Sequence, residues 1–341
     1  MLVHSSLRKD DHIILSLSED GKPTSDPGFD KYRLEHNAFP EMDFSEIDTS
    51  VRFLGRKMGL PLIISSITGG GKDSRKINIA LAEIANDFNI GFAVGSQTCA
   101  ISDKSFEKSF KVRMSAPNIL IFANIGAVQL NYGFSIDECK RAIDMADADA
   151  LIFHLNPLQE IFQHEGTRNF SGLFNKIEKI CAKLDAPVIV KEVGYGISAS
   201  VAKKLCDIGV YAVEVAGAGS ISWSEIEKKR SNDVVVQNAA RSFLDWGNPT
   251  TECIKEISKE AKKMKIIASG GVNTGVHMAK SIALGADLCG NASDFLRKVV
   301  ESRAECENFI ETLSLELRTA MFCTGCKNIQ ELKSAKIVYK N

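Results

Sequence analysis

Polar and charged side chains recur at one kind of position in this chain, directly after short apolar runs. The groups best suited to chemistry are Lys191, His154 and Glu160, with the amides of Asn124 and Gln159. A carboxylate suits Mg2+, which prefers oxygen ligands and keeps much of its water. A lysine that points into a buried site brings positive charge to an anion or to an electron-rich cofactor. Because one run after another ends in such a group, we expect a ligand with many polar atoms.

The apolar runs repeat from about residue 60 onward. Each is rich in β-branched residues, ends in a Gly, Ser or Asn loop, and precedes a stretch with helical periodicity. Strands that are almost entirely apolar are buried on both faces, which indicates a parallel sheet covered by helices. The expected strands are 60–66, 90–96, 119–126, 150–156, 187–194, 211–217, 265–271 and 287–292. Eight β–α repeats predict an α/β fold of the (β/α)8 TIM-barrel type, with its active site where the strands end.

Three segments lie outside the repeat. We expect residues 1–59 to form an N-terminal segment that covers one mouth of the barrel, and residues 60–341 to form the catalytic barrel domain. A polar-rich insert with Trp223 and Trp246 follows the sixth expected strand and is a candidate lid. The last forty or so residues are expected to provide a closing helix.

The clearest helical stretches between strands are 78–88, 136–146, 200–207, 252–264 and 276–284.

Composition excludes several classes of protein. Lys and Arg number 42 and Asp and Glu number 43, so the net charge of -1 lacks the basic excess of a nucleic-acid binder. Nine cysteines, an odd number in a long chain, indicate reduced thiols and a cytoplasmic location. The charge-free run 114–136 contains Pro117 and several Asn and Gly residues, so we expect no membrane span. Cys323 and Cys326 have metal-ligand spacing, but no second pair follows them.

Two glycine motifs have specific interpretations. The sequence 194–199 matches the GxGxxA dinucleotide fingerprint, and Glu214 lies where the ribose carboxylate of that motif would be. However, the match follows the fifth strand, and Lys191 stands at the end of that strand, so we favour a barrel loop. The Gly pair 270–271 after the seventh strand and the Gly-Asn-Ala sequence 290–292 after the eighth lie where many barrels bind a phosphate through backbone N–H groups.

Taken in order, the motifs of this chain resemble those of the type 2, FMN-dependent isopentenyl-diphosphate delta-isomerases. The resemblance covers nearly the whole chain, and RKDDHI, HLNPLQE and KEVGYGIS are its most specific parts. The matching motifs are RKDDHI (8–13), LEHNAFPEMD (34–43), SITGG (66–70), GSQ (95–97), ANIGAVQL (123–130), HLNPLQE (154–160), EGTRNF (165–170), KEVGYGIS (191–198), DWGNPT (245–250), SGGVNTG (269–275) and TGCKNIQEL (324–332).

The resemblance implies cofactors and residue roles. It implies FMN as the resident cofactor, Mg2+ held by Glu160, and NADPH or NADH as the reductant of the flavin. It implies catalytic roles for Lys191, Gln159 and His154, a small diphosphate substrate, and a homotetramer or larger homo-oligomer. The residues implied around FMN are Ser66, Ile67, Thr68, Ser96, Asn124, Lys191, Ser222, Gly271, Val272, Asn273, Asn291 and Ala292. The residues implied at the substrate are Arg8, Lys9, His12, His154, Asn156 and Gln159.

Three positions depart from the family pattern. Thr98 stands where the family usually has Arg after GSQ, and Gly219-Ser220-Ile221 stands where it usually has GGT. Asn273 occupies the place of an Arg after the Gly pair of the seventh strand. Loss of an arginine that binds phosphate with two hydrogen bonds should weaken phosphate binding.

Two other functions are compatible with this kind of barrel. One is an FMN-dependent 2-hydroxy-acid oxidoreductase, which needs a histidine base and arginines for a carboxylate; no His–Arg pair follows the seventh expected strand. The other is a degenerate flavin-binding redox protein, an interpretation supported by Thr98 in place of arginine. A test for isomerisation by the reduced protein separates these from the isomerase.

Overall fold

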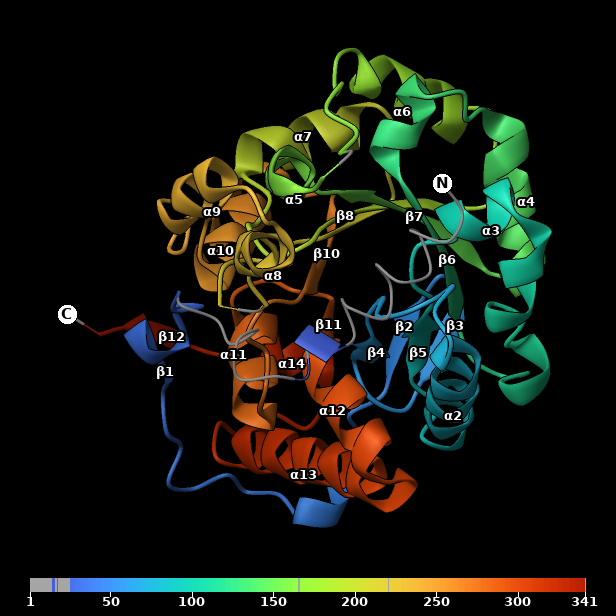
Figure 1. The fold of residues 1–341 in the computed structure, drawn as a ribbon. Helices are drawn as coiled ribbons and strands as arrows, with labels where there is room; N and C mark the ends of the chain where they lie inside the picture. The colour runs from blue at the N-terminus through green and yellow to red at the C-terminus, as the bar shows by residue number, and fades with distance from the viewer. Residues whose placement is uncertain (1–13, 16, 18–24, 165, 220, 341) are drawn as a thin grey trace.

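Eight parallel strands form a closed barrel in the computed structural model, which describes residues 14, 15, 17, 25–164, 166–219 and 221–340. The spatial order of the strands is β10-β11-β4-β5-β6-β7-β8-β9, and helices surround them (Figure 1). This confirms the predicted (β/α)8 fold. The strands are β4 (Leu62–Ile64), β5 (Gly91–Ala93), β6 (Ile121–Gly126), β7 (Ala150–Leu155), β8 (Val188–Glu192), β9 (Ala212–Glu214), β10 (Lys265–Ala268) and β11 (Leu288–Asn291).

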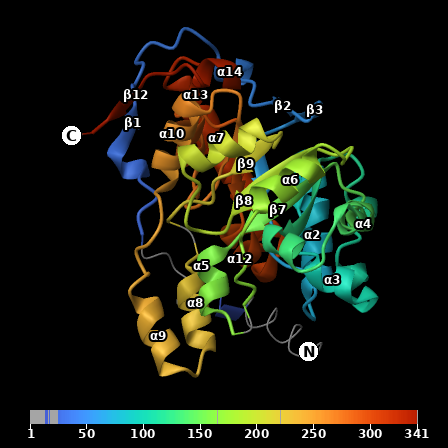
Figure 2. The ribbon, with the colours of Figure 1, turned by 90° about the horizontal axis from the view of Figure 1, so that it is seen from above.

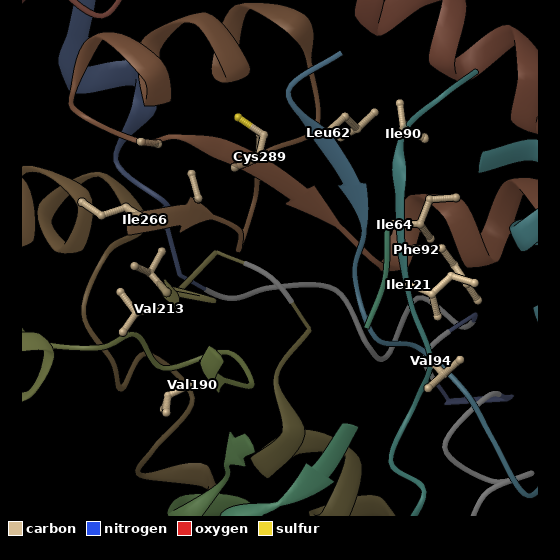
Figure 3. Close-up of a cluster of buried hydrophobic side chains, with 14 of the residues drawn as sticks. Leu62, Ile64, Ile90, Phe92, Val94, Ile121, Val190, Val213, Ile266 and Cys289 are labelled. Carbon is tan, nitrogen blue, oxygen red and sulfur yellow. The ribbon is translucent and has the colours of Figure 1, made fainter. Parts of the chain in front are cut away.

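The helices pack against the outer face of the barrel through alternate strand residues. Figure 3 shows this layer, with Leu62, Ile64 and Phe92 among its buried side chains. The five helical stretches expected from the sequence correspond to α2, α4, α7, α10 and α11. The helices are α2 (Ser74–Asp87), α3 (Thr98–Ser102), α4 (Ile136–Ala146), α5 (Pro157–Phe162), α6 (Leu173–Cys181), α7 (Ala199–Asp207), α8 (Trp223–Arg230), α9 (Val234–Arg241), α10 (Thr250–Glu260), α11 (Gly275–Ala283), α12 (Ser293–Glu301), α13 (Arg303–Phe322) and α14 (Ile329–Leu332).

The inside of the barrel has one apolar layer and, above it, an inner polar layer in which six of the eight residues carry polar side chains and two are glycines. Side chains along a strand point alternately to opposite faces, so residues two apart share the inner face. The apolar layer consists of Ile63, Ala93, Phe122, Ile152, Ile189, Ala212, Ile267 and Leu288. Two residues further along the same eight strands lie Ser65, Gly95, Asn124, His154, Lys191, Glu214, Ser269 and Gly290. The alternation thus places the polar groups at the carboxyl ends of the strands.

A hairpin closes the other end of the barrel. Its strands are β2 (Val51–Phe53) and β3 (Arg56–Met58), and Phe53 and Met58 pack against the inner apolar layer. The ring of Phe53 meets the ring of Tyr211 edge-on, with centroids 5.5 Å apart. Figure 2 shows β2 and β3 at the end of the molecule opposite α8 and α9. Among the described residues, this hairpin covers the amino end of the barrel, and the cavity lies at the carboxyl ends of the strands.

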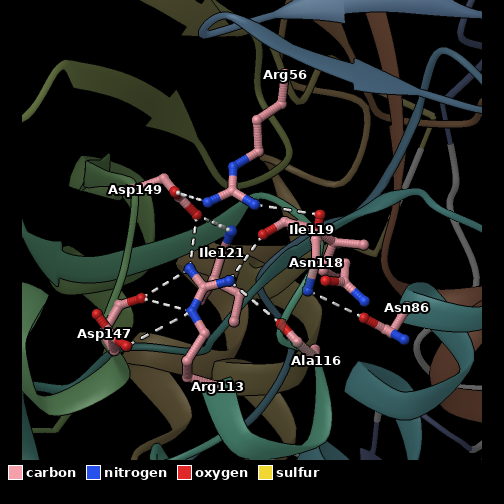
Figure 4. A network of polar contacts seen from close by, with 9 residues as sticks. All are labelled: Arg56, Asn86, Arg113, Ala116, Asn118, Ile119, Ile121, Asp147 and Asp149. Atoms are coloured by element: carbon pink, nitrogen blue, oxygen red, sulfur yellow. Dashed lines mark hydrogen bonds and ion pairs between the residues drawn. The ribbon is translucent and has the colours of Figure 1, made fainter.

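The carboxylate of Asp149 connects this hairpin to the same end of the barrel by hydrogen bonds (Figure 4). Its Oδ1 accepts a hydrogen bond from Arg56 at 3.2 Å, and its Oδ2 accepts from Arg113 at 2.7 Å and from the backbone N–H of Ile121 at 2.9 Å. One half-buried carboxylate thus joins β3, β6 and the loop before β6.

We expect Asp149→Asn to lower the free energy of unfolding by about 2–3 kcal/mol, because it removes a charge that receives hydrogen bonds from two arginines. Urea unfolding of both proteins measures the difference. Asp147→Asn is the matched control, since the side chain of Asp147 is 80% exposed and lies 3.8 Å from Arg113. Exposed pairs of this kind contribute at most about 1 kcal/mol. Equal losses in the two variants would contradict the role assigned to Asp149.

The segments outside the repeat pack around the barrel. The insert after β9 forms α8 and α9, and α13 is the closing helix. Beyond it the structure adds α14 and the strand β12 (Ile337–Tyr339), which pairs antiparallel with β1 (Tyr32–Leu34). Within the described ranges, no helix combines the length and the apolar character needed to cross a bilayer.

Candidate active site

A cavity opens at the carboxyl ends of the barrel strands, and all eight residues of the inner polar layer line it. Most of the predicted site residues lie on its wall as well. Those that line it are Ser66, Ile67, Thr68, Ser96, Asn124, His154, Asn156, Gln159, Glu160, Lys191, Gly271, Val272, Asn273, Asn291 and Ala292. The structure therefore brings together side chains that come from every part of the barrel sequence.

Ser222 is placed differently. Its hydroxyl accepts from the backbone N–H of Glu225 and so caps α8, while its neighbours Ile221 and Trp223 line the cavity. The predicted substrate ligands Arg8, Lys9 and His12 lie outside the described residues, as does Ser220.

One wall of the cavity is a chain of three hydrogen-bonded side chains. The amide nitrogen of Asn124 donates to Ser66 Oγ at 2.6 Å, and Asn124 Oδ1 lies 2.8 Å from Nδ1 of His154. Because an amide oxygen can only accept, His154 carries a proton on Nδ1. Asn124 thus fixes the orientation of the imidazole. Ser66 receives one hydrogen bond and keeps its own proton for another acceptor.

A buried ion pair lies at the floor of the cavity. Lys191 on β8 and Glu214 on β9 are neighbours in the parallel register, with Nζ 3.3 Å from Oε1. Lys191 also donates to the backbone oxygen of Glu192 at 2.7 Å, and Ser65 donates to Glu214 Oε1 at 2.7 Å. Glu214 and Ser65 were not predicted as site residues. The two-residue spacing from Ala212 and Ile63 is the signal that would have found them.

The short helix α5 and its N-cap residue Asn156 bring two oxygen-bearing side chains, Asn156 and Glu160, to the cavity wall. Asn156 donates from Nδ2 to Glu160 Oε1 at 2.8 Å, and Thr167 donates from its backbone N–H and its hydroxyl to Glu160 Oε2 at 2.6 and 3.0 Å. The amide oxygen of Asn156 is buried and has no hydrogen-bond partner among the described residues. In the same ranges, no group of three or more His, Cys, Asp or Glu side chains is arranged so that it could hold a metal ion by itself. A single carboxylate beside an unused amide oxygen fits Mg2+, which takes its other ligands from phosphate and water.

The insert reaches this part of the site through Glu227 on α8. Glu227 is 1% exposed, accepts from Gln159 Nε2 at 3.4 Å and accepts from Arg230 at 2.7 Å. Glu227 could not be predicted as a site residue, because nothing in the local sequence of α8 indicates that it faces α5. The contact means that α8 helps to set the orientation of the Gln159 amide.

The structure shows where two positions lie that bear on phosphate binding: Thr98, which stands where the family pattern has arginine, and Arg168. Thr98 lines the cavity, and its hydroxyl lies 3.1 Å from that of Ser96. Arg168, the nearest arginine in the sequence to the α5 motif, donates to the backbone oxygens of Glu160 and Ile161 and does not line the cavity. Among the described residues on the cavity wall, Lys191 is the sole lysine or arginine.

The loops after β10 and β11 form the remaining wall. Gly270 and Gly271 have φ values of 96° and 74°, which favour glycine, and a Cβ on Gly270 would lie 2.3 Å from the backbone oxygen of Gly217. Asn291 donates from Nδ2 to the backbone oxygen of Val272 at 3.0 Å, joining the two loops. The cavity thus offers three kinds of donor: backbone N–H groups in these two loops, amides and hydroxyls along the wall, and the ammonium group of Lys191 at the floor. This set of donors fits a flavin mononucleotide.

The glycine loop 194–199 does not serve as a dinucleotide site. The carboxylate of Glu192 is buried and accepts from the backbone N–H groups of Val193, Gly194 and Tyr195 at 2.7, 2.8 and 2.5 Å. The donors that a pyrophosphate would need are therefore occupied. Burial raises the pKa of Glu192 to about 7, although the three N–H groups and Lys191 act to lower it.

This raised pKa predicts a pH-dependent stability. The folded protein binds the Glu192 proton more tightly than the unfolded chain does, so the stabilising contribution is complete below the ordinary pKa of 4.5 and is lost as the pH rises through about 7. We expect the difference in unfolding free energy between wild type and Glu192→Gln to change by about 2–3 kcal/mol between pH 5 and pH 8. Urea unfolding at both pH values measures it. A difference that does not change with pH would show that Glu192 is ionised throughout.

Comparisons with known proteins agree with the geometry. Residues 142–339 match the family model of the FMN-dependent dehydrogenases. The chain is 46% identical to an isopentenyl-diphosphate delta-isomerase of Nostoc sp. over 96% of this chain and 93% of the relative. It is 42% identical to one of Rickettsia canadensis over 97% of this chain and 96% of the relative.

Solved structures give the same fold at lower sequence similarity. A mandelate oxidase with bound (S)-2-phenylpropionate superposes with a TM-score of 0.68 at 16% identity, covering 99% of this chain and 98% of the other. At that identity the likeness concerns the barrel alone. With the family model and the full-length relatives taken together, this chain belongs to the isopentenyl-diphosphate delta-isomerase family of FMN-dependent barrel proteins.

Proposed function

We propose that this chain interconverts isopentenyl diphosphate and dimethylallyl diphosphate, with reduced FMN and Mg2+. The observation that carries the proposal is the joint placement of Lys191 at the cavity floor and of the Asn156–Glu160 oxygen pair on the adjoining wall. One position suits an electron-rich ring, and the other suits a metal-bound diphosphate. Membership of the isomerase family supports the same assignment.

The walls described above would hold the flavin. Asn124, Ser66 and Ser96 supply hydrogen bonds, and the loops 270–273 and 290–292 supply backbone N–H groups for the phosphate. Lys191 would balance negative charge on the ring. FMN, once reduced, supplies an electron-rich ring that supports proton transfer and stabilises positive charge on the substrate.

The diphosphate would be held near α5. Glu160 would bind Mg2+, with Asn156 Oδ1 as a further oxygen, and His154 and Gln159 would contact the substrate. We also assign Arg8, Lys9 and His12 to the diphosphate, as the family resemblance implies. These cations take on added importance because Thr98 replaces an arginine of the family pattern.

Shifting a double bond requires that one proton is added and another is removed. The alkene is unactivated, so its protonation creates positive charge that must be kept away from water. Ile221 and Trp223 give the cavity an apolar side, and Gln159, fixed by Glu227, would orient the reacting end of the substrate. The reaction is redox-neutral, so NADPH or NADH is needed only for the first reduction of the flavin.

Assembly and location are parts of the same proposal. We assign the chain to the cytoplasm as a homotetramer or larger homo-oligomer, without a nucleic-acid or membrane partner. All nine cysteines lie within the described residues and are free thiols, which fits a reducing compartment. Size-exclusion chromatography with light scattering tests the assembly.

The test of function is anaerobic incubation of the FMN-loaded, reduced protein with isopentenyl diphosphate and Mg2+. Formation of dimethylallyl diphosphate supports the proposal, and its absence in the presence of bound flavin contradicts it. Oxidation of 2-hydroxy acids would instead indicate an oxidoreductase. That outcome is disfavoured by His277, the first histidine after β10, which stacks on Phe29 with centroids 4.4 Å apart and does not line the cavity.

A further inference from the structure

Among the described residues that line the cavity, Lys191 and Glu214 are the charged pair at its floor. Lys191 and Glu214 are 8% and 0% exposed, and their charged groups lie 3.3 Å apart. As a pair they are neutral. A ring placed beside Lys191 would therefore meet a cation whose field is partly cancelled by the carboxylate 3.3 Å from it.

The carboxylate of Glu214 is only partly satisfied by hydrogen bonds. Ser65 donates to its Oε1 at 2.7 Å, and its Oε2 has no hydrogen-bond partner among the described residues. A buried acceptor without a partner reduces stability. Gly290 makes room for the arrangement, because a Cβ there would lie 2.4 Å from Ser65 Oγ and 3.4 Å from Glu214 Oε1. These features indicate that the carboxylate is retained for its charge.

We propose that Glu214 is a positioning residue that partly neutralises Lys191 and thereby limits how strongly the site stabilises negative charge on the flavin. This inference rests on the proposed FMN site. Lys191 alone would favour the anionic forms of the ring, and the carboxylate beside it opposes that effect. In an isomerase the ring then stays electron-rich and able to exchange protons with the substrate instead of being held as a tightly paired anion.

Sulfite provides a direct readout, because it adds to the oxidised flavin ring and leaves a negative charge on it. We expect Glu214→Gln to bind sulfite about tenfold more tightly than the wild type, since a charge within a few ångströms shifts such equilibria by one or more orders of magnitude. The midpoint potential of the flavin should rise in the same variant. Sulfite affinity is read from the visible spectrum of the FMN-loaded protein and does not require turnover.

Two further variants complete the test. Glu214→Asp keeps the charge but draws it back from Lys191, so its sulfite affinity should lie between those of wild type and Glu214→Gln. If the Gln variant does not fold, tighter sulfite binding in Glu214→Asp than in wild type still supports the inference. Glu46→Gln is the matched control: Glu46 is an ion-paired carboxylate, 3.0 Å from Lys327, that does not line the cavity, so sulfite affinity should stay at the wild-type value.

The outcomes separate this inference from the proposed function. The inference is overturned if Glu214→Gln binds sulfite no more tightly than the wild type, even if its thermal stability falls. If the Gln variant is not obtained, the same result in Glu214→Asp overturns it. A wild type that binds FMN but does not isomerise the substrate overturns the proposed function and leaves the sulfite comparison valid. A wild type that binds no FMN overturns both.

Discussion

Replacement of Lys191 by methionine is expected to reduce isomerisation by about 10²–10³-fold, the usual effect of removing a preorganised charge from an active site. Methionine keeps the length and the apolar stem of the side chain but removes the ammonium group that faces Glu214 and the backbone of Glu192. Flavin content should fall as well. The initial rate at saturating substrate and the visible absorbance of the purified protein measure the two effects.

The single variant leaves Glu214 as a buried carboxylate without a counter-ion, which costs about 3–5 kcal/mol of stability. Lys191→Met combined with Glu214→Gln removes both charges, so it should restore the unfolding midpoint without restoring the rate. This pair of variants separates loss of charge at the cavity from loss of fold. If the double variant is folded and isomerises at the wild-type rate, the role given to Lys191 is wrong.

Glu160→Gln is expected to have the second-largest effect. The amide keeps the shape of the side chain and an acceptor for Thr167, but it removes the negative charge that would hold Mg2+. Metal contributions of several kcal/mol correspond to a loss of about 10²-fold or more in rate at ordinary Mg2+ concentration. Rates measured over a series of MgCl2 concentrations should show a much higher half-saturation point.

Glu178→Gln serves as the comparison for that experiment. Glu178 lies on α6 and is exposed, so its neutralisation alters the net charge by the same amount without touching the cavity. Its dependence on Mg2+ should match that of the wild type. Equal shifts in both variants would mean that Glu160 acts through long-range charge and not as a metal ligand.

The barrel could be predicted from sequence because its strands have a strong local signature. Runs such as 119–126 and 150–156 are apolar on both faces, and helices such as α4, which begins at a Ser135–Glu138 capping box, carry their own start signals. Most of the predicted polar residues on the cavity wall follow from the same reasoning, since parallel strands end at one rim, whereas Ile67 and Val272 are implied by the family resemblance alone.

The contacts between strands could not be predicted in that way. Lys191 and Glu214 are adjacent only through the register of β8 and β9, and in sequence Glu214 looked like part of a dinucleotide motif. Glu227 reaches Gln159 from an insert whose packing no local pattern specifies. Arg168 is close in sequence to the α5 motif, but only its hydrogen bonds to the backbone oxygens of Glu160 and Ile161 show how its guanidinium is used.

The pairing of β1 with β12 also constrains when the molecule can be completed. Tyr32 pairs with Tyr339, and Lys340 donates to the backbone of Lys31, so partners synthesised early and late must meet. At about 5–20 residues per second, a ribosome needs roughly 15–60 s to travel between them. Throughout that interval the stretch around Phe29 and Tyr32 lacks its final strand partner, so this early-made segment is among the last to be locked in place.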